Sequence, residues 1–241
     1  MEMYKIERKT YELVENFSGT PEVQIVRLKP VDGKPMKFDA GMFVMIYGID
    51  PDGKQYIGRA FSIASDPDSE IMEFFVVKEH NGHRSHFLDS KIGDKFIVSG
   101  PSGQFRFVPE EDKKVLFIAG GTGFAPFISM MRNIKKHNYG TDAILIYSVK
   151  YPSEIILKDE LYSLSKELKM KKVITVTRPS EGDHWDGEKG HIDSSKIKEY
   201  APDVSERTVY ICGPLNFVKA MKDSLAELKV DPKKIKADVW G

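Results

Sequence analysis

Cysteine is nearly missing from this sequence: among 241 residues the only thiol is that of Cys212. One cysteine cannot form a disulfide framework or a four-cysteine zinc site. It also cannot hold an iron–sulfur cluster ligated by cysteines of this chain alone. The sequence therefore excludes the protein classes whose fold or redox chemistry depends on clustered cysteines.

A net charge of one sign is missing as well, because Lys plus Arg and Asp plus Glu both total 36. This balance provides no overall field for a nucleic acid or an anionic membrane. No run of about 18 apolar residues occurs, and residues 1–9 contain no apolar signal core. We therefore expect a cytoplasmic protein without a nucleic-acid partner and without membrane insertion.

The first part of the chain, residues 1–108, consists of short alternating segments separated by turns. Dipeptides such as Asp32-Gly33 and Asn81-Gly82 supply the turn chemistry. The expected strands are 5–16, 22–29, 42–47, 59–63, 71–77 and 95–98, with one short helix at 85–90. Many short strands and a single short helix predict a small closed antiparallel β-barrel domain.

Residues 109–241 open with a charged, proline-led break at 109–114 and then show a different pattern. The expected apolar strands are 115–119, 143–149, 173–176 and 208–212, and the expected helices are 126–136, 153–167 and 214–227. This alternation predicts an α/β domain, with a parallel sheet and helices on both faces. We therefore expect two domains, 1–108 and 109–241, and a ligand site at the carboxyl ends of the parallel strands.

A glycine turn follows the first apolar strand of the second domain. Gly120, Gly121 and Gly123 allow a sharp turn and a close approach of a ligand to the backbone. Pro126 suits the first turn of a helix, whose free N–H groups and positive dipole end attract a phosphate. Because Pro126 stands where the dinucleotide fingerprint has its third Gly or Ala, an ordinary tight turn is the alternative.

Basic residues gather at the other strand ends. Lys150 and Arg178 each follow an expected strand, and His191 comes a little further along. An acid that would hold the ribose hydroxyls of NAD does not occur after the second strand until Glu154. Cations in place of a carboxylate favour the 2′-phosphate of NADPH, whereas an ordinary solvated lysine is the alternative at Lys150.

Two stretches of the barrel half carry candidate phosphate-binding groups. Arg59 at a strand end can pair bidentately with a phosphate, Phe61 offers a flat face, and Ser62 offers a small hydroxyl. The turn 81–85 (Asn-Gly-His-Arg-Ser) leads into a helix start and forms a second candidate cradle. An edge strand with a surface arginine is the alternative for the first stretch.

Histidines recur at every third position as His80, His83 and His86, which is a pattern that invites a metal site. This spacing on a glycine-containing turn does not bring three imidazoles together around one ion. Solvated or phosphate-facing histidines are the better interpretation, so we expect no metal site.

Two residues near the end of the sequence are candidate contacts of the reacting groups. Cys212 precedes Gly213 and Pro214 at a strand end, where a small polarizable side chain would line the reaction pocket. Ordinary core packing is the alternative for this thiol. Trp240 is either a packing plug or a cover that stacks on a flat ring.

The stretches 59–62 (Arg-Ala-Phe-Ser), 82–85 (Gly-His-Arg-Ser), 120–126 and 212–214 occur in this order along the chain. Together they resemble the flavin motif Arg-x-Tyr-Ser, the pyrophosphate motif, the nicotinamide-domain loop and the Cys-Gly-x motif of the ferredoxin–NADP reductase superfamily. The likeness is greatest to the compact bacterial-type members and covers nearly the whole chain. Phe61 replaces the tyrosine of the family's flavin motif.

The resemblance implies a barrel that binds FAD and a second domain that binds NADP(H) or NAD(H). Arg59 would neutralise a flavin phosphate, Phe61 would lie along the isoalloxazine, and Ser62 would hydrogen-bond flavin N5. Thr122 would sit where both ligands meet, and Trp240 would stack on the flavin face and move during turnover. The other implied contacts of FAD are Ala60, Val76, Lys78, His83, Arg84 and Ser85. Those of the nicotinamide nucleotide are Gly120, Gly121, Gly123, Lys150, Arg178, His191, Cys212, Gly213 and Pro214, and His191 stands where some NADPH-specific members have Arg.

By the same resemblance the chain would be an FAD-dependent oxidoreductase that passes hydride from NAD(P)H, with NADPH favoured, to flavin N5. Single electrons would then go to a separate carrier protein such as ferredoxin or flavodoxin, or travel the reverse way. One alternative is an NAD(P)H-dependent reductase of free flavin or small acceptors, and another is an electron-transfer subunit of a larger complex. Basic side chains near the end of the sequence could meet an acidic partner, with a solvated charged surface as the alternative. These are Lys229, Lys233, Lys234 and Lys236.

Overall fold

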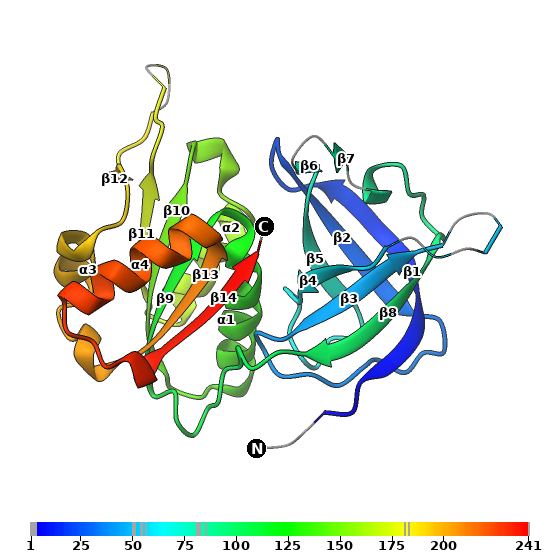
Figure 1. Ribbon diagram of the computed structural model, residues 1–241, viewed down its shortest axis with the longest axis horizontal. Helices are drawn as coiled ribbons and strands as arrows, with labels where there is room; N and C mark the ends of the chain where they lie inside the picture. Colours follow the sequence, from blue (N-terminus) through cyan, green and yellow to red (C-terminus); the bar gives the residue numbers. More distant parts are fainter. Residues whose placement is uncertain are drawn as a thin grey trace.

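The structure is a computed structural model that describes residues 4–49, 52–53, 55, 57–80, 83–84, 86–180, 182 and 184–240, without the side chains of 80, 83, 84 and 86. Two domains lie side by side, an N-terminal barrel and a C-terminal α/β domain (Figure 1). The two-domain architecture expected from the sequence is confirmed. Of the candidate site residues, Ser85 lies outside the described residues, together with Gly82 of the same motif.

The N-terminal domain is built around one antiparallel sheet in the order β4-β3-β8-β1-β2-β5. Its strands are β1 (Glu7–Ser18), β2 (Val23–Pro30), β3 (Phe43–Gly48), β4 (Arg59–Ser62), β5 (Met72–Val77) and β8 (Lys95–Ser102). Just beyond β4, the N–H of Ala64 donates to the carbonyl of Glu73 in β5 at 2.8 Å. The two edges of the sheet therefore meet, and the sheet nearly closes into the expected barrel. A small hairpin of β6 (Glu79–His80) and β7 (His83–Arg84) follows β5.

Strands β2 and β5 are buried on both faces. Val26 of β2 and Phe74 of β5 belong to the core inside the barrel. Their neighbours Ile25 and Phe75, which point the opposite way because side chains alternate along a strand, belong to a core shared with the second domain. The outer face of these two strands is therefore the surface on which the α/β domain packs.

The C-terminal domain has a parallel sheet in the order β12-β11-β10-β9-β13-β14. Its strands are β9 (Lys114–Gly120), β10 (Asp142–Val149), β11 (Lys171–Val176), β12 (Glu188–Lys189), β13 (Thr208–Pro214) and β14 (Ile235–Trp240). Its helices are α1 (Ala125–His137), α2 (Lys158–Glu167), α3 (Ser194–Tyr200) and α4 (Leu215–Glu227). Short 3₁₀ helices span His86–Leu88 in the barrel and Gly121–Phe124, Pro152–Glu154, Val204–Glu206 and Pro232–Lys234 in this domain. None of the helices in the described part of the chain is long and apolar enough to cross a membrane.

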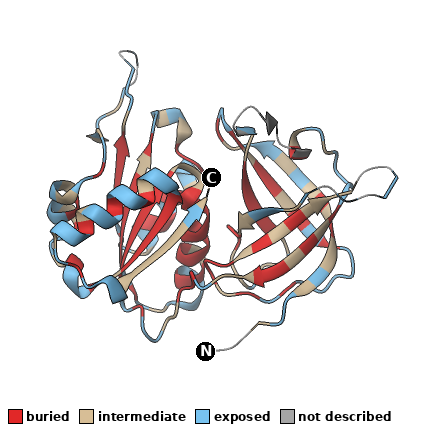
Figure 2. Cartoon of the chain, in the orientation of Figure 1, coloured by how far each residue is buried: buried red, intermediate tan, exposed pale blue. Residues whose placement is uncertain are grey.

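Helices cover both faces of the parallel sheet, as the sequence predicts. Phe117 of β9 packs in one cluster with side chains of α1 and α2 such as Phe127, whereas its neighbour Ile118 packs in another with side chains of α3 and α4 such as Val218. The central strand is consequently buried on both sides. Figure 2 shows buried strands enclosed by helices whose outer sides are exposed.

Some elements differ from the sequence-based expectation. The helix expected over 153–167 is divided into a 3₁₀ turn, Pro152–Glu154, and α2, which begins only at Lys158 because Leu157 adopts a left-handed φ of 49°. The helix expected at 85–90 is a single 3₁₀ turn. Strands β6, β7, β12 and β14 and the short helix α3 were not predicted. The first three are two-residue strands with no length over which a period could show, whereas β14 does alternate apolar Ile235, Ala237 and Val239 with polar residues.

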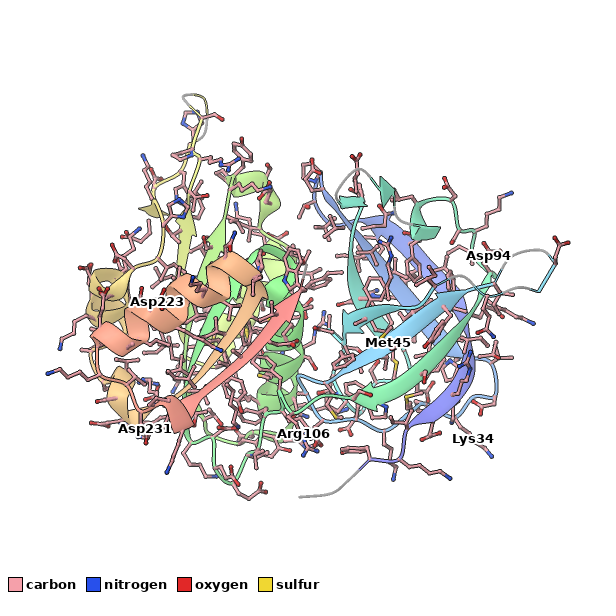
Figure 3. The ribbon with its side chains drawn as sticks, viewed as in Figure 1. Lys34, Met45, Asp94, Arg106, Asp223 and Asp231 are labelled. Carbon is pink, nitrogen blue, oxygen red and sulfur yellow. The ribbon has the colours of Figure 1, made fainter. Side chains whose placement is uncertain are left out.

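A shared apolar core and polar contacts join the two domains. Phe105, which follows β8, packs edge-to-face on Phe127 of α1 with ring centroids 5.9 Å apart, and on Tyr210 of β13 at 5.2 Å. The carbonyl of Arg106, a residue labelled in Figure 3 where the domains meet, accepts a hydrogen bond from the Tyr210 hydroxyl at 2.7 Å. The domains therefore contact each other through buried side chains as well as through the connecting segment.

One buried carboxylate fixes the segment that connects the domains. Asp112 accepts hydrogen bonds from the Val108 N–H at 2.7 Å and from the Tyr210 hydroxyl at 2.5 Å, and the ammonium of Lys236 lies 3.5 Å away. The domain boundary expected between residues 108 and 109 falls in this segment, which runs between β8 and β9, and it stays a prediction.

The buried phenol of Tyr11 predicts an alkaline loss of stability. Burial raises its pKa from 10.0 to about 12 in the folded protein. Between these pH values the unfolded chain releases the proton and the folded chain retains it, so the contribution of Tyr11 to stability is full below pH 10 and falls as pH rises toward 12, by up to roughly 3 kcal/mol. Urea unfolding from neutral pH into this window measures the slope. Tyr11→Phe should make the slope shallower, although burial also raises the pKa of Tyr147 and Tyr210, whose phenols still contribute. Tyr162→Phe on the surface is the control; equal slopes for both variants would contradict the assignment.

Candidate functional site

Two glycines shape the turn between β9 and α1, each for its own reason. Gly121 has a left-handed φ of +54°, and no atom lies within 4 Å of the place that a Cβ would take. Gly123 is closely packed, since a Cβ there would lie 2.2 Å from the carbonyl oxygen of Cys212. The turn is therefore pressed against β13 on one side and open on the other, with Pro126 in the first turn of α1.

A pocket of about 700 Å³ lies on the open side of this turn, between the two domains. Thr20, Val23 and Val77 line it from the barrel. The strand ends of the α/β domain line it from the other side, as is usual for ligand sites in such sheets. These contributions are Gly120, Gly121 and Thr122 after β9, Ser148, Val149 and Lys150 at β10, Thr177 and Arg178 after β11, and Pro214 at the end of β13.

The three basic residues named from the sequence line this same pocket. Lys150, Arg178 and His191 all contribute, although they come from separate segments. Glu154 lines it too, and its carboxylate accepts a hydrogen bond from the Lys150 N–H at 3.0 Å. This role of Glu154 was not predicted from the sequence, because residue 154 was expected inside a continuous helix.

Trp240 reaches the pocket through the parallel pairing of β14 with β13. In this register Trp240 lies beside Pro214, and both line the pocket. Thr122 lines it as well. The structure thus brings together one predicted catalytic residue and most of the predicted nucleotide contacts.

Cys212 is placed differently from the expected lining residue. Its side chain is fully buried in the shared core with Ala119 and Tyr210, and burial raises the pKa of its thiol well above the ordinary value. The pocket begins two residues further on, at Pro214, and Gly213 does not line it. Core packing, the alternative named from the sequence, describes the surroundings of this thiol, and its carbonyl is what the glycine turn contacts.

The predicted flavin strand β4 combines exposed and anchored side chains. Arg59 and Ala60 are exposed, and Ser62 is half-buried at the end of the strand. Phe61 is half-buried and packs edge-to-face on Phe74 and Phe87, with centroid distances of 6.2 and 5.6 Å. Its ring is therefore held by the barrel core.

Two further predicted flavin contacts have structural partners of their own. The side chain of Val76 belongs to the barrel core, so only its main chain is available to a ligand. The ammonium of Lys78 donates to the Ser18 hydroxyl at 3.1 Å and to the Pro21 carbonyl at 2.9 Å, and thereby holds the turn between β1 and β2. The side chains of His83 and Arg84 lie outside the described residues, although their main chain forms β7.

The pocket fits a dinucleotide. The open side of Gly121 leaves room for close approach of a phosphate to the turn, and the basic side chains of Lys150 and Arg178 suit a polyanion. Among the described residues no group of three or more His, Cys, Asp or Glu is placed to hold a metal ion. The histidines at positions 80, 83 and 86 have side chains outside that description.

Comparison with known proteins agrees with this geometry. Residues 10–107 match the model of the oxidoreductase FAD-binding domain, and residues 117–223 match that of the oxidoreductase NAD-binding domain. NADH-cytochrome b5 reductase 1 of Candida glabrata is 30% identical over 234 residues, which make up 94% of this chain and 81% of that protein. The chain belongs to the ferredoxin–NADP reductase family, with an FAD-binding and an NAD-binding domain.

Other relatives are longer than this chain. The glycine betaine monooxygenase reductase subunit of Pseudomonas aeruginosa is 28% identical over 208 residues, covering 85% of this chain and 56% of the relative. The chain thus spans a little more than half the length of that protein. The structure of the ferredoxin reductase in carbazole 1,9a-dioxygenase shares the fold with a TM-score of 0.85 at 23% identity, covering 100% of this chain and 71% of the other.

Alanine substitutions at Gly121 and Gly123 should have different effects, one on dinucleotide binding and the other on the stability of the fold. Gly123→Ala should destabilise the protein by about 1–3 kcal/mol, because its methyl group would meet the backbone of Cys212. Gly121→Ala should lose only about 1 kcal/mol through its left-handed φ, but it should weaken dinucleotide binding, because its methyl group faces the pocket. Urea unfolding and calorimetric titration with NADP⁺ measure the two effects. Unchanged affinity in Gly121→Ala would contradict a phosphate at this turn.

Proposed function

We propose that this protein is an FAD-dependent oxidoreductase that takes hydride from NAD(P)H, with NADPH favoured, and passes single electrons to a separate carrier such as ferredoxin or flavodoxin, or runs in reverse. One observation carries the proposal: a single pocket joins the glycine turn, three basic side chains and Trp240 to the barrel at the start of β2 and the end of β5, whereas the flavin motif of β4 lies outside its lining. A binding site shared by two cofactor domains is what transfer between two stacked rings requires.

The chain's own part in the reaction is to orient the two ligands. The nicotinamide and flavin rings, when bound, supply the hydride-transfer chemistry. The turn at Gly121 and the basic side chains would hold the dinucleotide phosphates, and the hydroxyl of Ser62 would hydrogen-bond flavin N5. Arg59 would neutralise a flavin phosphate. Trp240 would cover the flavin face and exclude water until the nicotinamide replaces it.

The nucleotide preference depends on opposing charges in the pocket. Lys150, Arg178 and His191 favour a 2′-phosphate, whereas Glu154 suits unphosphorylated ribose hydroxyls. Glu154 already accepts the Lys150 N–H, which occupies part of its hydrogen-bonding capacity. Lys150, Arg178 and His191 gather at the strand ends of the α/β domain and support NADPH as the preferred donor, while two further carboxylates, Glu22 and Glu79, line the pocket from the barrel side.

An electron-transfer subunit of an oxygenase system is a second candidate function. Several relatives carry such names, among them the terephthalate 1,2-dioxygenase reductase component 1 of Comamonas sp., of which this chain covers 68%. Leu215 is 62% exposed and Val239 is 45% exposed on either side of the Pro214–Trp240 pair, as a contact surface for a partner beside the pocket would require. The basic stretch is a weaker candidate, since Lys234 and Lys236 donate to the Ser205 carbonyl and the Tyr210 hydroxyl.

The visible spectrum tests the proposed function directly. The purified protein should be yellow, or become yellow with FAD, and should bleach when NADPH is added anaerobically. A parallel titration with NADH measures the preference. Protein that stays colourless after soaking in FAD and FMN would overturn the proposal, and reoxidation by ferredoxin, flavodoxin or free flavin distinguishes among the acceptors.

Arg178→Ala should change the donor preference without loss of flavin. Removing one exposed phosphate contact should raise KM for NADPH by roughly tenfold, about 1.4 kcal/mol, and change KM for NADH far less. Glu154→Gln should act in the opposite direction, improving NADPH relative to NADH. Lys166→Ala removes an exposed cation of α2 outside the pocket and serves as the control. A parallel loss for both nucleotides in Arg178→Ala would refute the 2′-phosphate contact.

A further inference from the structure

Helix α1 contacts both predicted cofactor sites. Its N-terminal end begins at the glycine turn, and one of its later turns reaches the main chain just beyond Ser62. There the hydroxyl of Ser129 donates to the Ser65 carbonyl at 2.7 Å, and Nη1 of Arg132 donates to the Ala64 carbonyl at 2.8 Å. The helix that presents the nucleotide turn thus holds the continuation of the flavin strand.

Glu73 of β5 completes the attachment of this segment. Its side chain is only 4% exposed and accepts Arg132 Nη1 at 2.8 Å and Arg27 Nε at 2.7 Å. Its main-chain carbonyl accepts the Ala64 N–H at 2.8 Å. Ala64 is consequently fixed through its N–H by Glu73 and through its carbonyl by Arg132.

The other edge of the Arg132 guanidinium faces α2. Its Nε and Nη2 donate to the two carboxylate oxygens of Glu160 at 2.7 and 2.8 Å, a bidentate pair that sets the plane of the guanidinium. Burial alone lowers the pKa of Arg132, but Glu160 and Glu73 outweigh it, and the pKa is raised above its ordinary value. Glu160 lies in the first turn of α2, directly after the loop that carries Lys150 and Glu154.

We propose that Arg132, with Ser129, is a positioning residue that sets the place of Ser62 against the nucleotide turn and transmits the docking of the α/β domain to the flavin strand. This role rests on the proposed function. The Arg132 guanidinium joins α1 to β5 through Glu73 and to α2 through Glu160, and Arg27 of β2 binds the same Glu73. The carbonyls that α1 holds stand two and three residues after Ser62. Attachment of the domains does not depend on Arg132 alone, because Phe105 packs on Phe127 and Tyr210, and the Arg106 carbonyl accepts a hydrogen bond from the Tyr210 hydroxyl.

Matched variants separate positioning from stability. Ser129→Ala is compared with Ser165→Ala, another buried serine whose hydroxyl donates to a carbonyl, that of Leu161 within α2 at 2.6 Å. Arg132→Lys is compared with Arg27→Lys, which alters the other cation on Glu73 without touching Ala64 or Ser65. Thermal unfolding measures the stability of all four variants.

The readouts are the rate of flavin reduction and the visible spectrum and midpoint potential of the bound flavin. Ser129→Ala and Arg132→Lys should slow single-turnover reduction by NADPH at least roughly tenfold, with the nucleotide dissociation constant changed less than about twofold, because misplacement of reacting groups affects chemistry more than binding. They should also shift the visible spectrum and midpoint potential of the bound flavin before any nucleotide is added. The two control variants should keep the wild-type rate, spectrum and potential.

The outcomes distinguish this inference from the proposed function. Wild-type protein that binds no flavin, or binds it and is not reduced by NADPH or NADH, overturns the proposed function and the positioning role together. Wild-type protein that is reduced normally, with Ser129→Ala and Arg132→Lys no slower than their controls and spectrally unchanged, overturns the positioning role alone.

Discussion

The buried contact between the outer face of β2 and β5 and the helix α1 is the constraint on which the candidate site depends. Ile25 and Phe75 of the barrel enter the same core as Phe127 of α1, and the rings of Phe75 and Phe124 stack at 6.4 Å. Removing this apolar surface from water holds the two domains at a defined separation. The pocket exists because the glycine turn lies at the margin of that contact.

Sequence periodicity predicted the architecture because each strand and helix buries a face along its own length. The expected barrel strands begin within two residues of the observed ones. The parallel direction of the strands in the α/β domain follows from the alternation of strands and helices along the sequence. Contacts between residues far apart in the sequence could not be predicted from periodicity. Arg132 and Glu73, for example, are 59 positions apart, and neither a sequence pattern nor their spacing links them. The break before α2 at Leu157 was not predicted either, because nothing in the sequence marks a leucine that adopts a left-handed conformation. For the same reason the pocket role of Glu154 was not predicted.

The motif residues differ in the way they contribute to the site. Gly121 and Arg178 face the pocket, so their types can be understood from ligand chemistry. Gly123 packs instead against the main chain of Cys212, and its type follows from the lack of space between the turn and β13. A motif can therefore indicate a binding site correctly while some of its members serve only the packing beneath it.

The early end of the 3₁₀ turn and the late start of α2 have a wider consequence. The loop between Val149 and Lys158 carries Lys150 and Glu154 to the pocket, yet it is flanked by a buried strand end and by a helix whose Glu160 is already secured. The loop has two parts: Ile155 and Ile156 are buried in the core shared by the domains, whereas Lys150 is exposed and Glu154 is half-buried at the pocket. Under the proposed function, substitutions at Lys150 and Glu154 would alter the choice of electron donor while the buried part of the loop stays in place.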